Sequence, residues 1–195
     1  MFLLYFVCLG IFLFYINQFK SERSYRTHHK TIKVFKNNKK PDWVVNKIWG
    51  IDLTGKHDSN KSNQHILGIV DHGSRFNIVL KYIDNKSSKR LLFEIYLAVK
   101  EYGRPEYIRT DNDIIFKSKL FKLGLKLMGI KHQTTDIGCP WMNGRIERFF
   151  GTLKEKLNQI LVTDSRHLDH HLIGFRFWHN NVRICMNLNG ETPKE

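Results

Sequence analysis

A strand-like pattern that begins at Ile48 constrains the fold of this chain more than any other feature. From Ile48 to Thr54 the sequence alternates as in a strand with one buried face. Two more strand-like segments follow near residues 65–71 and 76–83, separated by a polar loop and by a turn that contains Gly73. Three successive strands followed by alternating helices and strands indicate a compact α/β domain.

The second half of this domain alternates helical and strand-like segments. Ser87 is suited to cap a helix that runs to Tyr102, because Gly103 and Pro105 follow it directly. The remaining pattern predicts four further segments after a short strand at Tyr107–Thr110: a helix over 118–128, a strand over 130–133, and helices over about 143–162 and 168–183.

Three acidic residues stand out by where they fall in this pattern. Asp52 lies within the first strand, Asp111 directly follows the fourth, and Glu147 lies early on a helix. A carboxylate inside an apolar strand is costly unless a cation or a hydrogen-bond donor meets it. Hard cations such as Mg²⁺ prefer carboxylate oxygens, so these residues are candidate metal ligands.

The trio, the thirty-five residues between Asp111 and Glu147, and the flanking residues resemble a known family. They are similar to the catalytic core of acidic-triad (DDE) transposases of bacterial insertion sequences and of retroviral integrases. The resemblance runs from about Trp49 to the C-terminus. The residues that carry it beside the triad are Asp71-x-x-Ser74-Arg75, Thr110, Asn112, Pro140, Gly144, Arg148-Phe149, Thr152-Leu153-Lys154, Asn181-x-Arg183 and Thr192-Pro193.

The resemblance implies a ribonuclease H-like fold, with a five-stranded mixed sheet and helices on both faces. It implies metal-dependent DNA strand cleavage and strand transfer, the reactions of transposition, DNA integration and recombination. Asp52, Asp111 and Glu147 would be the catalytic residues and would bind two Mg²⁺ (or Mn²⁺) ions, with Asp52 bridging both. The implied partners are DNA, as transposon ends and target, and a second copy of the chain, because two DNA ends must be held together.

The predicted helix around Glu147 also carries candidate DNA-binding residues. At about 100° per residue its apolar residues share one face, which should pack on the sheet. These residues are Ile146, Phe149, Phe150, Leu153, Leu157 and Ile160. Glu147 lies at the edge of that face, in line with Asn143 and Lys154, and Arg145 and Arg148 flank it. We expect these four residues to contact DNA, Lys154 by binding a phosphate; the alternative for each cation is an ordinary solvated side chain.

The chain divides into three regions: an apolar segment at 1–17, a basic linker at 18–47 and the core at 48–195. Residues 1–16 are apolar except for Gly10, near the lower length limit for a membrane span. The segment would anchor the chain in the inner membrane. Basic residues follow it, and by the positive-inside rule they would leave the rest of the chain in the cytoplasm, associated with DNA. The alternative is a helix packed against protein or coding sequence from a rearranged gene.

Charge and cysteine content limit the class of partner and the compartment. The formal charge is +14, and residues 18–47 carry half of it, which favours a polyanionic partner such as nucleic acid or an anionic membrane surface. A plain solvated spacer is the alternative for the linker. Cys8, Cys139 and Cys185 lack the C-x-x-C spacing of a zinc finger and indicate a reducing compartment. The cluster of His167, His170 and His171 could bind a metal, but a solvated helix start is favoured.

Two other functions fit the same residues. One is a truncated, non-catalytic transposase remnant that binds DNA through its basic surface and is tethered to a membrane. The other is a nuclease of the same fold that cleaves DNA without joining it. Neither the apolar segment nor the linker shows a helix-turn-helix pattern, which puts sequence-specific recognition of transposon ends in doubt. Asp113 stands where the family tends to have Gly, so it is expected to crowd or recharge the metal site.

Overall fold

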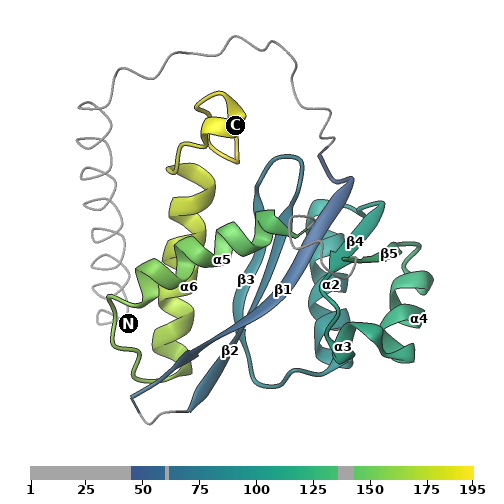
Figure 1. Ribbon diagram of the computed structural model, residues 1–195, viewed down its shortest axis with the longest axis horizontal. Coiled ribbons are helices and arrows are strands. Elements are labelled where there is room, and N and C mark those ends of the chain that lie inside the picture. The colour runs from purple at the N-terminus through teal and green to yellow at the C-terminus, as the bar shows by residue number, and fades with distance from the viewer. Residues whose placement is uncertain (1–44, 60–61, 136–142) are drawn as a thin grey trace.

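A five-stranded mixed sheet with the strand order β3-β2-β1-β4-β5 lies at the centre of the molecule (Figure 1). The computed structural model describes residues 45–59, 62–135 and 143–195. β1, β2 and β3 pair antiparallel, whereas β4 runs parallel to β1 and β5 runs parallel to β4. The strands are β1 (Ile48–His57), β2 (Asn63–Asp71), β3 (Asn77–Ile83), β4 (Tyr107–Thr110) and β5 (Lys131–Thr134).

Helices cover both faces of the sheet, as the sequence predicts. They are α2 (Ser88–Tyr102), α3 (Ile114–Lys117), α4 (Lys119–Leu127), α5 (Gly144–Leu157) and α6 (Ser165–Asn181), with a 3₁₀ turn at Met186–Leu188. α5 and α6 lie on one side of the sheet, and α2, α3 and α4 lie on the other (Figure 1). Each side has its own cluster of buried apolar residues. The predicted α/β class and the mixed sheet with helices on both faces are confirmed.

The apolar face predicted for α5 forms the core on its side of the sheet. The ring of Phe149 lies 5.7 Å from that of Phe150 and 5.5 Å from that of Phe175 on α6. Phe150 fits against β2 because Gly68 has no side chain: a Cβ there would lie 2.6 Å from the ring. Burying each phenylalanine contributes roughly 1.5–3 kcal/mol, so these contacts hold α5 firmly on the sheet. Ile160 is only half-buried and lies beyond the end of the helix.

Side-chain caps explain where several helices begin. The side chain of Ser87 accepts a hydrogen bond from the backbone N–H of Arg90, as expected for the predicted cap. Ser118 caps α4 in the same way through the N–H of Phe121. Asp164 accepts from the N–H of His167, so α6 begins at Ser165 rather than at the predicted residue 168. The sequence reading missed this cap.

Two further boundaries differ from the prediction. α5 ends at Leu157, well before the predicted Val162. Val162 is fully buried and its carbonyl accepts a hydrogen bond of 2.8 Å from Ser59, beyond the end of β1, so the chain leaves the helix to reach that contact. The single turn of α3 was not predicted; it begins after Asp113, whose side chain accepts from the N–H of Ile115. Asp113 therefore has a capping role in this structure.

Some predictions fall outside the described residues. These predictions concern the apolar segment 1–17, nearly all of the linker 18–47, and the loop that contains Cys139 and Pro140. Within the described ranges, no helix has the length and apolar character needed to cross a membrane. The division into three regions stays a prediction.

Candidate active site

Strand register brings Asp52 and Asp111 to neighbouring positions in the sheet. β1 and β4 are parallel, and Gly50 is the partner of Arg109. Asp52 and Asp111 each follow that pair by two residues, so Asp52, midway along β1, lies at the level of Asp111, which directly follows β4. Both side chains are half-buried. The first strand pairs on its other side with β2, where Gly68 is the partner of Asp52.

Glu147 comes from the first turn of α5, which packs across β1 and β2. Asn143 is the N-cap residue of that helix, and its carbonyl accepts hydrogen bonds from the N–H groups of Ile146 and Glu147 at 3.1 and 3.2 Å. The neighbouring side chain of Ile146 is fully buried, whereas Glu147 is exposed. The carboxylate thus lies at the rim of the core, as the helical pattern predicts.

Electrostatics show that the three carboxyl groups share one neighbourhood. Burial, together with the negative charges of Asp111 and Glu147, raises the pKa of Asp52 to about 6. The backbone N–H of Leu53, which donates to Asp52 at 2.7 Å, and the ammonium of Lys154 both lower that pKa. An arrangement of like charges around a half-buried carboxyl group is electrostatically complementary to a cation.

The carboxyl groups are near one another but do not form a closed ligand set. Across residues 45–59, 62–135 and 143–195, no three His, Cys, Asp or Glu side chains are grouped so as to hold a metal ion. Chemically, three hard oxygen donors fit Mg²⁺ or Mn²⁺. In geometry, the donors lie within electrostatic range of Asp52 without converging on a single ion.

The loop that carries Asp111 is held by contacts that the sequence did not indicate. Thr110 Oγ1 lies 2.9 Å from the Nε2 atom of His132 on β5. Asn112 donates a 2.7 Å hydrogen bond to the carbonyl of Thr135, and Asp111 accepts one from the N–H of Asp113. Asp111 is therefore fixed between β4 and β5 by its neighbours.

The predicted DNA-binding residues separate into two groups. Arg148 and Lys154 are exposed on α5, as expected. Arg145 instead is half-buried, and its guanidinium donates to the backbone carbonyl of His72, which follows β2. Asn143 is only 2% exposed. In this conformation Arg145 and Asn143 fix the start of α5 against the sheet, whereas Arg148 and Lys154 are accessible to a ligand.

His72 and Gly50 are part of the site and were missed by the sequence reading. Burial, together with the cations Arg145, Arg109 and Arg75, lowers the pKa of His72 to about 3. A Cβ at Gly50 would lie 2.4 Å from the His72 ring, so only glycine leaves room for the imidazole. The neutral ring fills the space between β1 and the start of α5.

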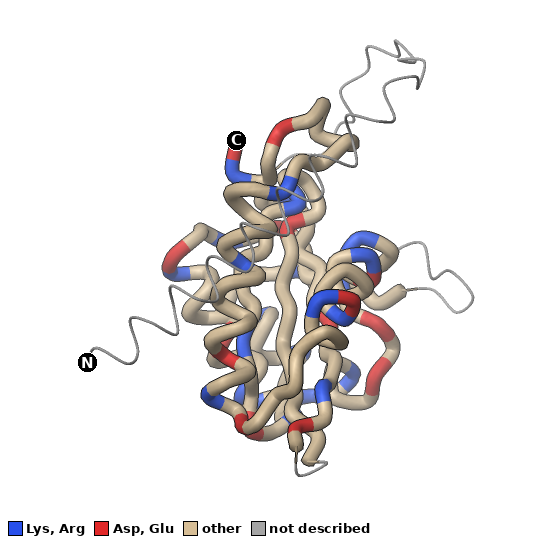
Figure 2. The backbone as a smooth tube through the Cα atoms, turned by 90° about the vertical axis from the view of Figure 1, so that its left-hand side faces the viewer, with Lys and Arg blue, Asp and Glu red and all other residues tan. Residues whose placement is uncertain are grey.

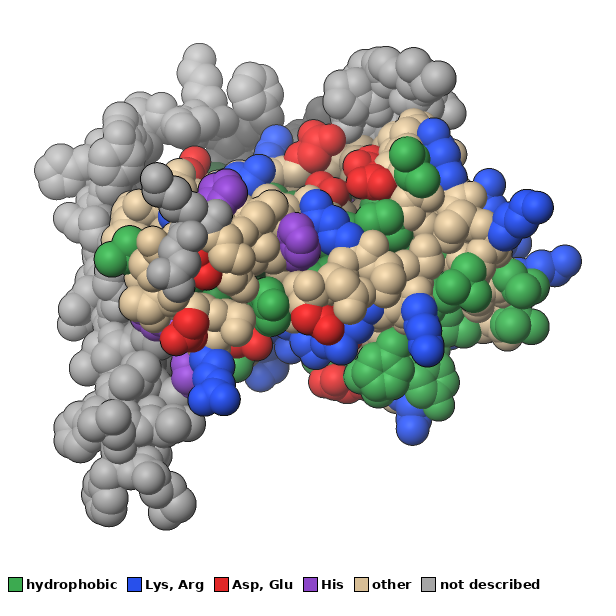
Figure 3. Space-filling view, turned by 90° about the horizontal axis from the view of Figure 1, so that it is seen from below, with side chains coloured by type: hydrophobic (Ala, Val, Ile, Leu, Met, Phe, Trp, Pro, Cys, Tyr) green, Lys and Arg blue, Asp and Glu red, His purple; other side chains and the backbone are tan. Residues whose placement is uncertain are grey.

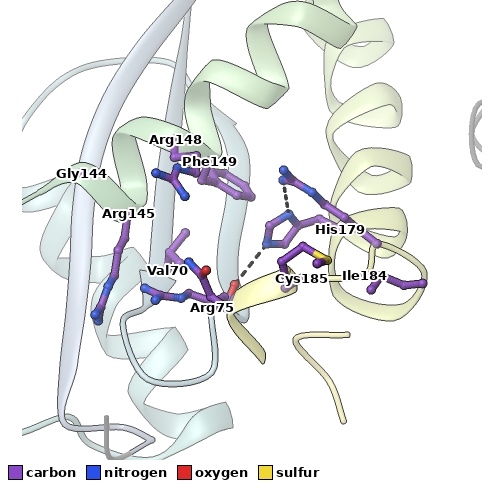
Figure 4. A pocket seen from close by; sticks show the side chains of 12 residues that line it. Val70, Arg75, Gly144, Arg145, Arg148, Phe149, His179, Ile184 and Cys185 are labelled. Carbon is purple, nitrogen blue, oxygen red and sulfur yellow. Dashed lines mark hydrogen bonds between the residues drawn. The ribbon is translucent and has the colours of Figure 1, made fainter. Parts of the chain in front are cut away.

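A pocket of about 510 Å³ opens beside the first two turns of α5 (Figure 4). Four arginines line it, from the turn after β2, from α5 and from the segment after α6: Arg75, Arg145, Arg148 and Arg183. We call it the arginine pocket. His179 and Cys185 also line it. The family resemblance contains Ser74-Arg75 and Asn181-x-Arg183, but no sequence signal places them together.

Two smaller expectations are settled by the structure. Asp71 makes the expected turn contact, because its Oδ2 atom accepts from the N–H and the hydroxyl of Ser74 at 2.8 and 2.7 Å. His167 and His171 lie in the first turns of α6 with their Nε2 atoms 3.0 Å apart. They form no group of three potential ligands with other described residues, and they do lie at a helix start, but His171 is buried rather than solvated.

Comparisons with known proteins agree with this architecture. The fold matches that of the human T-cell leukemia virus type 2 (HTLV-2) integrase catalytic core, in a structure solved with magnesium. The TM-score is 0.61 and the sequence identity 22%, and the match covers 76% of this chain and 94% of the integrase core. A simian T-cell lymphotropic virus intasome structure matches with a TM-score of 0.67 and 21% identity, covering 78% of this chain and 54% of that one. The domain is therefore of the integrase catalytic core class, with a ribonuclease H-like fold.

The sequence comparisons identify the relatives. Residues 76–162 match the family described as the TnsB C-terminal domain. A protein of insertion element IS476 from Xanthomonas euvesicatoria is 25% identical over 141 residues, 72% of this chain and 41% of that protein. An uncharacterized Caenorhabditis elegans protein is 32% identical over 67% of this chain, and the HTLV-2 Gag-Pro-Pol polyprotein is 26% identical over 76%.

These matches confirm the predicted resemblance: the chain is similar to insertion-element transposases and to retroviral integrases. It spans a limited part of the relatives, 10% of the Caenorhabditis elegans protein and of the HTLV-2 polyprotein. The comparisons concern the catalytic core and not the other parts of those longer proteins.

Proposed function

We propose that the chain catalyses metal-dependent DNA strand cleavage and strand transfer. The observation that carries this proposal is the environment of Asp52: a half-buried carboxyl group whose pKa is raised to about 6 by burial and by Asp111 and Glu147. Burying like charges together costs stability, and such an arrangement is typical of a catalytic or metal site rather than of a structural one. Similarity to transposases and retroviral integrases supports DNA as the substrate.

In this proposal Asp52, Asp111 and Glu147 would hold two Mg²⁺ (or Mn²⁺) ions. The HTLV-2 integrase core has been solved with magnesium, which supports the choice of metal. When bound, the ions would activate the attacking oxygen and neutralise charge at phosphorus. The side chain of Glu147 is exposed on α5, so core packing does not fix its rotamer.

DNA binding in the proposal rests on the exposed cations next to the triad. Lys154 lies close enough to Asp52 to lower its pKa, so a phosphate held by Lys154 would lie beside the carboxyl groups. Lys and Arg occur on most of the elements, interspersed with Asp and Glu (Figure 2). With a formal net charge of +14, the whole chain attracts a polyanion in addition to these specific contacts.

A cleavage and strand-transfer assay on the full chain tests the proposal. We expect nicking of duplex DNA and joining of its 3′ ends in Mg²⁺ or Mn²⁺, lost in Asp52→Asn, Asp111→Asn and Glu147→Gln. Glu155→Gln is the matched control for Glu147→Gln, because Glu155 is also exposed on α5 and should leave activity intact. Full activity in any of the three triad variants would contradict the proposal.

The same assay separates the alternative functions. Salt-sensitive DNA binding without cleavage in wild-type protein would favour the non-catalytic remnant. Cleavage without joining would favour a nuclease with the same active site. Only cleavage followed by joining supports a transposase or integrase activity.

We further propose that the chain self-associates through α2 and α6. The HTLV-2 integrase core has been solved in dimeric and trimeric forms, which supports oligomers in this group. Both helices expose large apolar side chains, namely Phe93, Tyr96 and Leu97 on α2 and Ile173 and Phe177 on α6. On the face shown in Figure 3, hydrophobic side chains gather on the side of the molecule where α2 and α4 lie. Apolar patches of this kind mark interaction surfaces.

Localisation is proposed from the sequence alone. We propose a DNA-associated protein of the cytoplasm that residues 1–17 anchor to the inner membrane. Deletion of residues 1–17 should move the protein from the membrane fraction to the supernatant. An unchanged distribution would mean that the segment is not an anchor.

A further inference from the structure

The arginine pocket concentrates positive charge without a matching set of carboxylates. Its four guanidinium groups come from three places that are distant in sequence. None of the ion pairs between described residues involves Arg75, Arg148 or Arg183. The thiol group of Cys185 and, to a smaller extent, Asp71 raise the pKa of Arg75, but both carboxylate oxygens of Asp71 already accept backbone hydrogen bonds.

Burial makes this concentration of charge costly. Burial lowers the pKa of Arg75, and the charge of Arg148 lowers it further. The Nη1 atom of Arg75 is buried and has no hydrogen-bond partner among the described residues. A bound anion would satisfy that donor and relieve the repulsion at once.

The backbone at Arg75 also indicates that the side chain is needed there. Its φ of 64° lies in the left-handed region, which favours glycine or asparagine. Holding another residue there costs about 1 kcal/mol or more. The turn is kept by two hydrogen bonds, from Arg75 N–H to the carbonyl of Asp71 at 3.0 Å and from His179 to the carbonyl of Arg75 at 3.1 Å. This geometry directs the Arg75 side chain into the pocket (Figure 4).

The opposite wall of the pocket is equally well fixed. The Arg183 guanidinium lies 5.6 Å from the ring centre of Trp178 and 3.5 Å from the Nδ1 atom of His179. Val70 and Phe149 supply apolar lining. Fixed guanidinium groups around a partly apolar pocket are suited to phosphate, because their planar N–H groups match its oxygens.

We propose that the arginine pocket binds a phosphate group, held by Arg75, Arg148 and Arg183. Gly144, Arg145 and Arg148 line the pocket, and Glu147 lies on the same two turns of α5. A phosphate in the pocket would therefore lie against the same two turns of α5 that carry the candidate catalytic carboxylate. Two sources carry this chemistry: the backbone of a bound DNA strand and a free phosphate compound. DNA as the source rests on the proposed function, whereas the phosphate site does not.

Alkylation of Cys185 tests the site, because this residue lines the pocket. The full chain is treated with N-ethylmaleimide in EDTA, and modification of the Cys185 peptide is followed by mass spectrometry. Separate samples contain pyrophosphate, duplex DNA, duplex DNA with uncharged methylphosphonate linkages, or sodium chloride at matched ionic strength. We expect pyrophosphate to slow alkylation several-fold while sodium chloride has little effect. Equal protection by sodium chloride would overturn the proposal.

Variants show whether the arginines of the pocket bind the pyrophosphate that protects Cys185. Arg148→Gln alters an exposed side chain, and Arg75→Asn keeps a residue that tolerates the left-handed backbone. Each should weaken protection by pyrophosphate about tenfold, the loss expected for a charge-assisted hydrogen bond. Arg166→Gln, an exposed arginine on the first turn of α6, should change nothing. Thermal unfolding confirms that each variant is folded, and undiminished protection in both pocket variants would refute the site.

The DNA samples identify the source of the phosphate. Protection by ordinary duplex but not by the methylphosphonate duplex would assign the pocket to the DNA backbone. Protection by pyrophosphate alone would assign it to a free phosphate compound. The protection assay contains EDTA, so its result does not depend on divalent metal. If wild-type protein shows protection in EDTA but no strand cleavage in a separate assay with Mg²⁺, the proposed function is refuted and the phosphate site stands.

Discussion

The Nε2 atom of His179 donates a 3.1 Å hydrogen bond to the backbone oxygen of Arg75, which ties the C-terminal half of α6 to the turn after β2. A carbonyl oxygen only accepts, so Nε2 must carry the proton. The Nδ1 atom, 3.5 Å from the Arg183 guanidinium, is then an acceptor. The ring is neutral in this arrangement, in agreement with its burial, which lowers the pKa of His179 to about 4.

We therefore predict that acid destabilises the fold. His179 and His72 have folded-state pKa values lowered to about 4 and about 3, whereas in the unfolded chain each binds a proton near 6.5. As pH falls below 6.5, these histidines bind protons in the unfolded state but not in the folded state, so the free energy of unfolding falls. Asp52 acts in the opposite direction below about 6, because its raised pKa lets the folded state bind a proton first. It is one group against three, since burial also lowers the pKa of His171, to about 4.

Urea unfolding at about pH 7 and about pH 5 measures this effect, with a loss of roughly 2 kcal/mol expected for each buried histidine. His179→Gln should reduce the loss, because the amide nitrogen of Gln can still donate to Arg75 but does not titrate. Stability that stays constant between the two pH values in wild-type protein would contradict the assignment of neutral buried histidines.

Asp52→Asn should increase stability while removing activity. Because burial and two neighbouring carboxylates raise the pKa of Asp52 to about 6, its ionised form is disfavoured at neutral pH. Asn keeps an oxygen that can accept from the N–H of Leu53 and removes the charge. After allowance for solvent screening of a half-buried group, we expect about 1–2 kcal/mol more unfolding free energy at about pH 7 without metal. Glu155→Gln serves as the comparison, and a destabilised Asp52→Asn variant would argue against a strained carboxyl site.

Self-association makes a separate prediction about the exposed apolar side chains of α2 and α6. Phe177→Glu places a charge on the exposed face of α6 without touching the core, because Phe177 is 47% exposed. We expect it to shift the protein toward monomer in sedimentation velocity at concentrations where the wild type associates. Leu161→Glu, a change at an even more exposed apolar residue on the loop before α6, is the control. Identical sedimentation of wild type and Phe177→Glu would show that α6 is not the interface.

Local signals in the sequence were enough for much of the fold. Strand β4 matches its predicted residues, and Ser87 caps α2 as expected, because alternation and capping depend on neighbouring residues. The buried face of α5 also follows from helical periodicity alone. The early end of α5 does not, because it depends on the hydrogen bond from Ser59 to Val162, across 103 positions of the chain.

The candidate site divides in the same way. The resemblance identified Asp52, Asp111 and Glu147, and the register of β1 with β4 explains why the two aspartates are neighbours. The inward turn of Arg145 toward His72 was not predictable, because these residues are 73 positions apart and an arginine at a helix start is normally solvated. The contact between His179 and Arg75, across 104 positions, was invisible for the same reason.

Two glycines test how tightly α5 is held against the sheet. At Gly68, which pairs with Asp52, an added Cβ would lie 2.6 Å from the ring of Phe150, a buried residue on α5. Gly68→Ala should therefore displace α5, cost about 1–3 kcal/mol of unfolding free energy and reduce strand cleavage, because Glu147 moves with the helix. At Gly151, on the exposed side of α5, an added Cβ meets no atom within 4 Å. Gly151→Ala should stabilise the protein by about 0.5–1 kcal/mol, since alanine favours the helix. Chemical denaturation of both variants decides the matter: a Gly68→Ala protein as stable as the wild type would mean that Phe150 does not fix the catalytic helix.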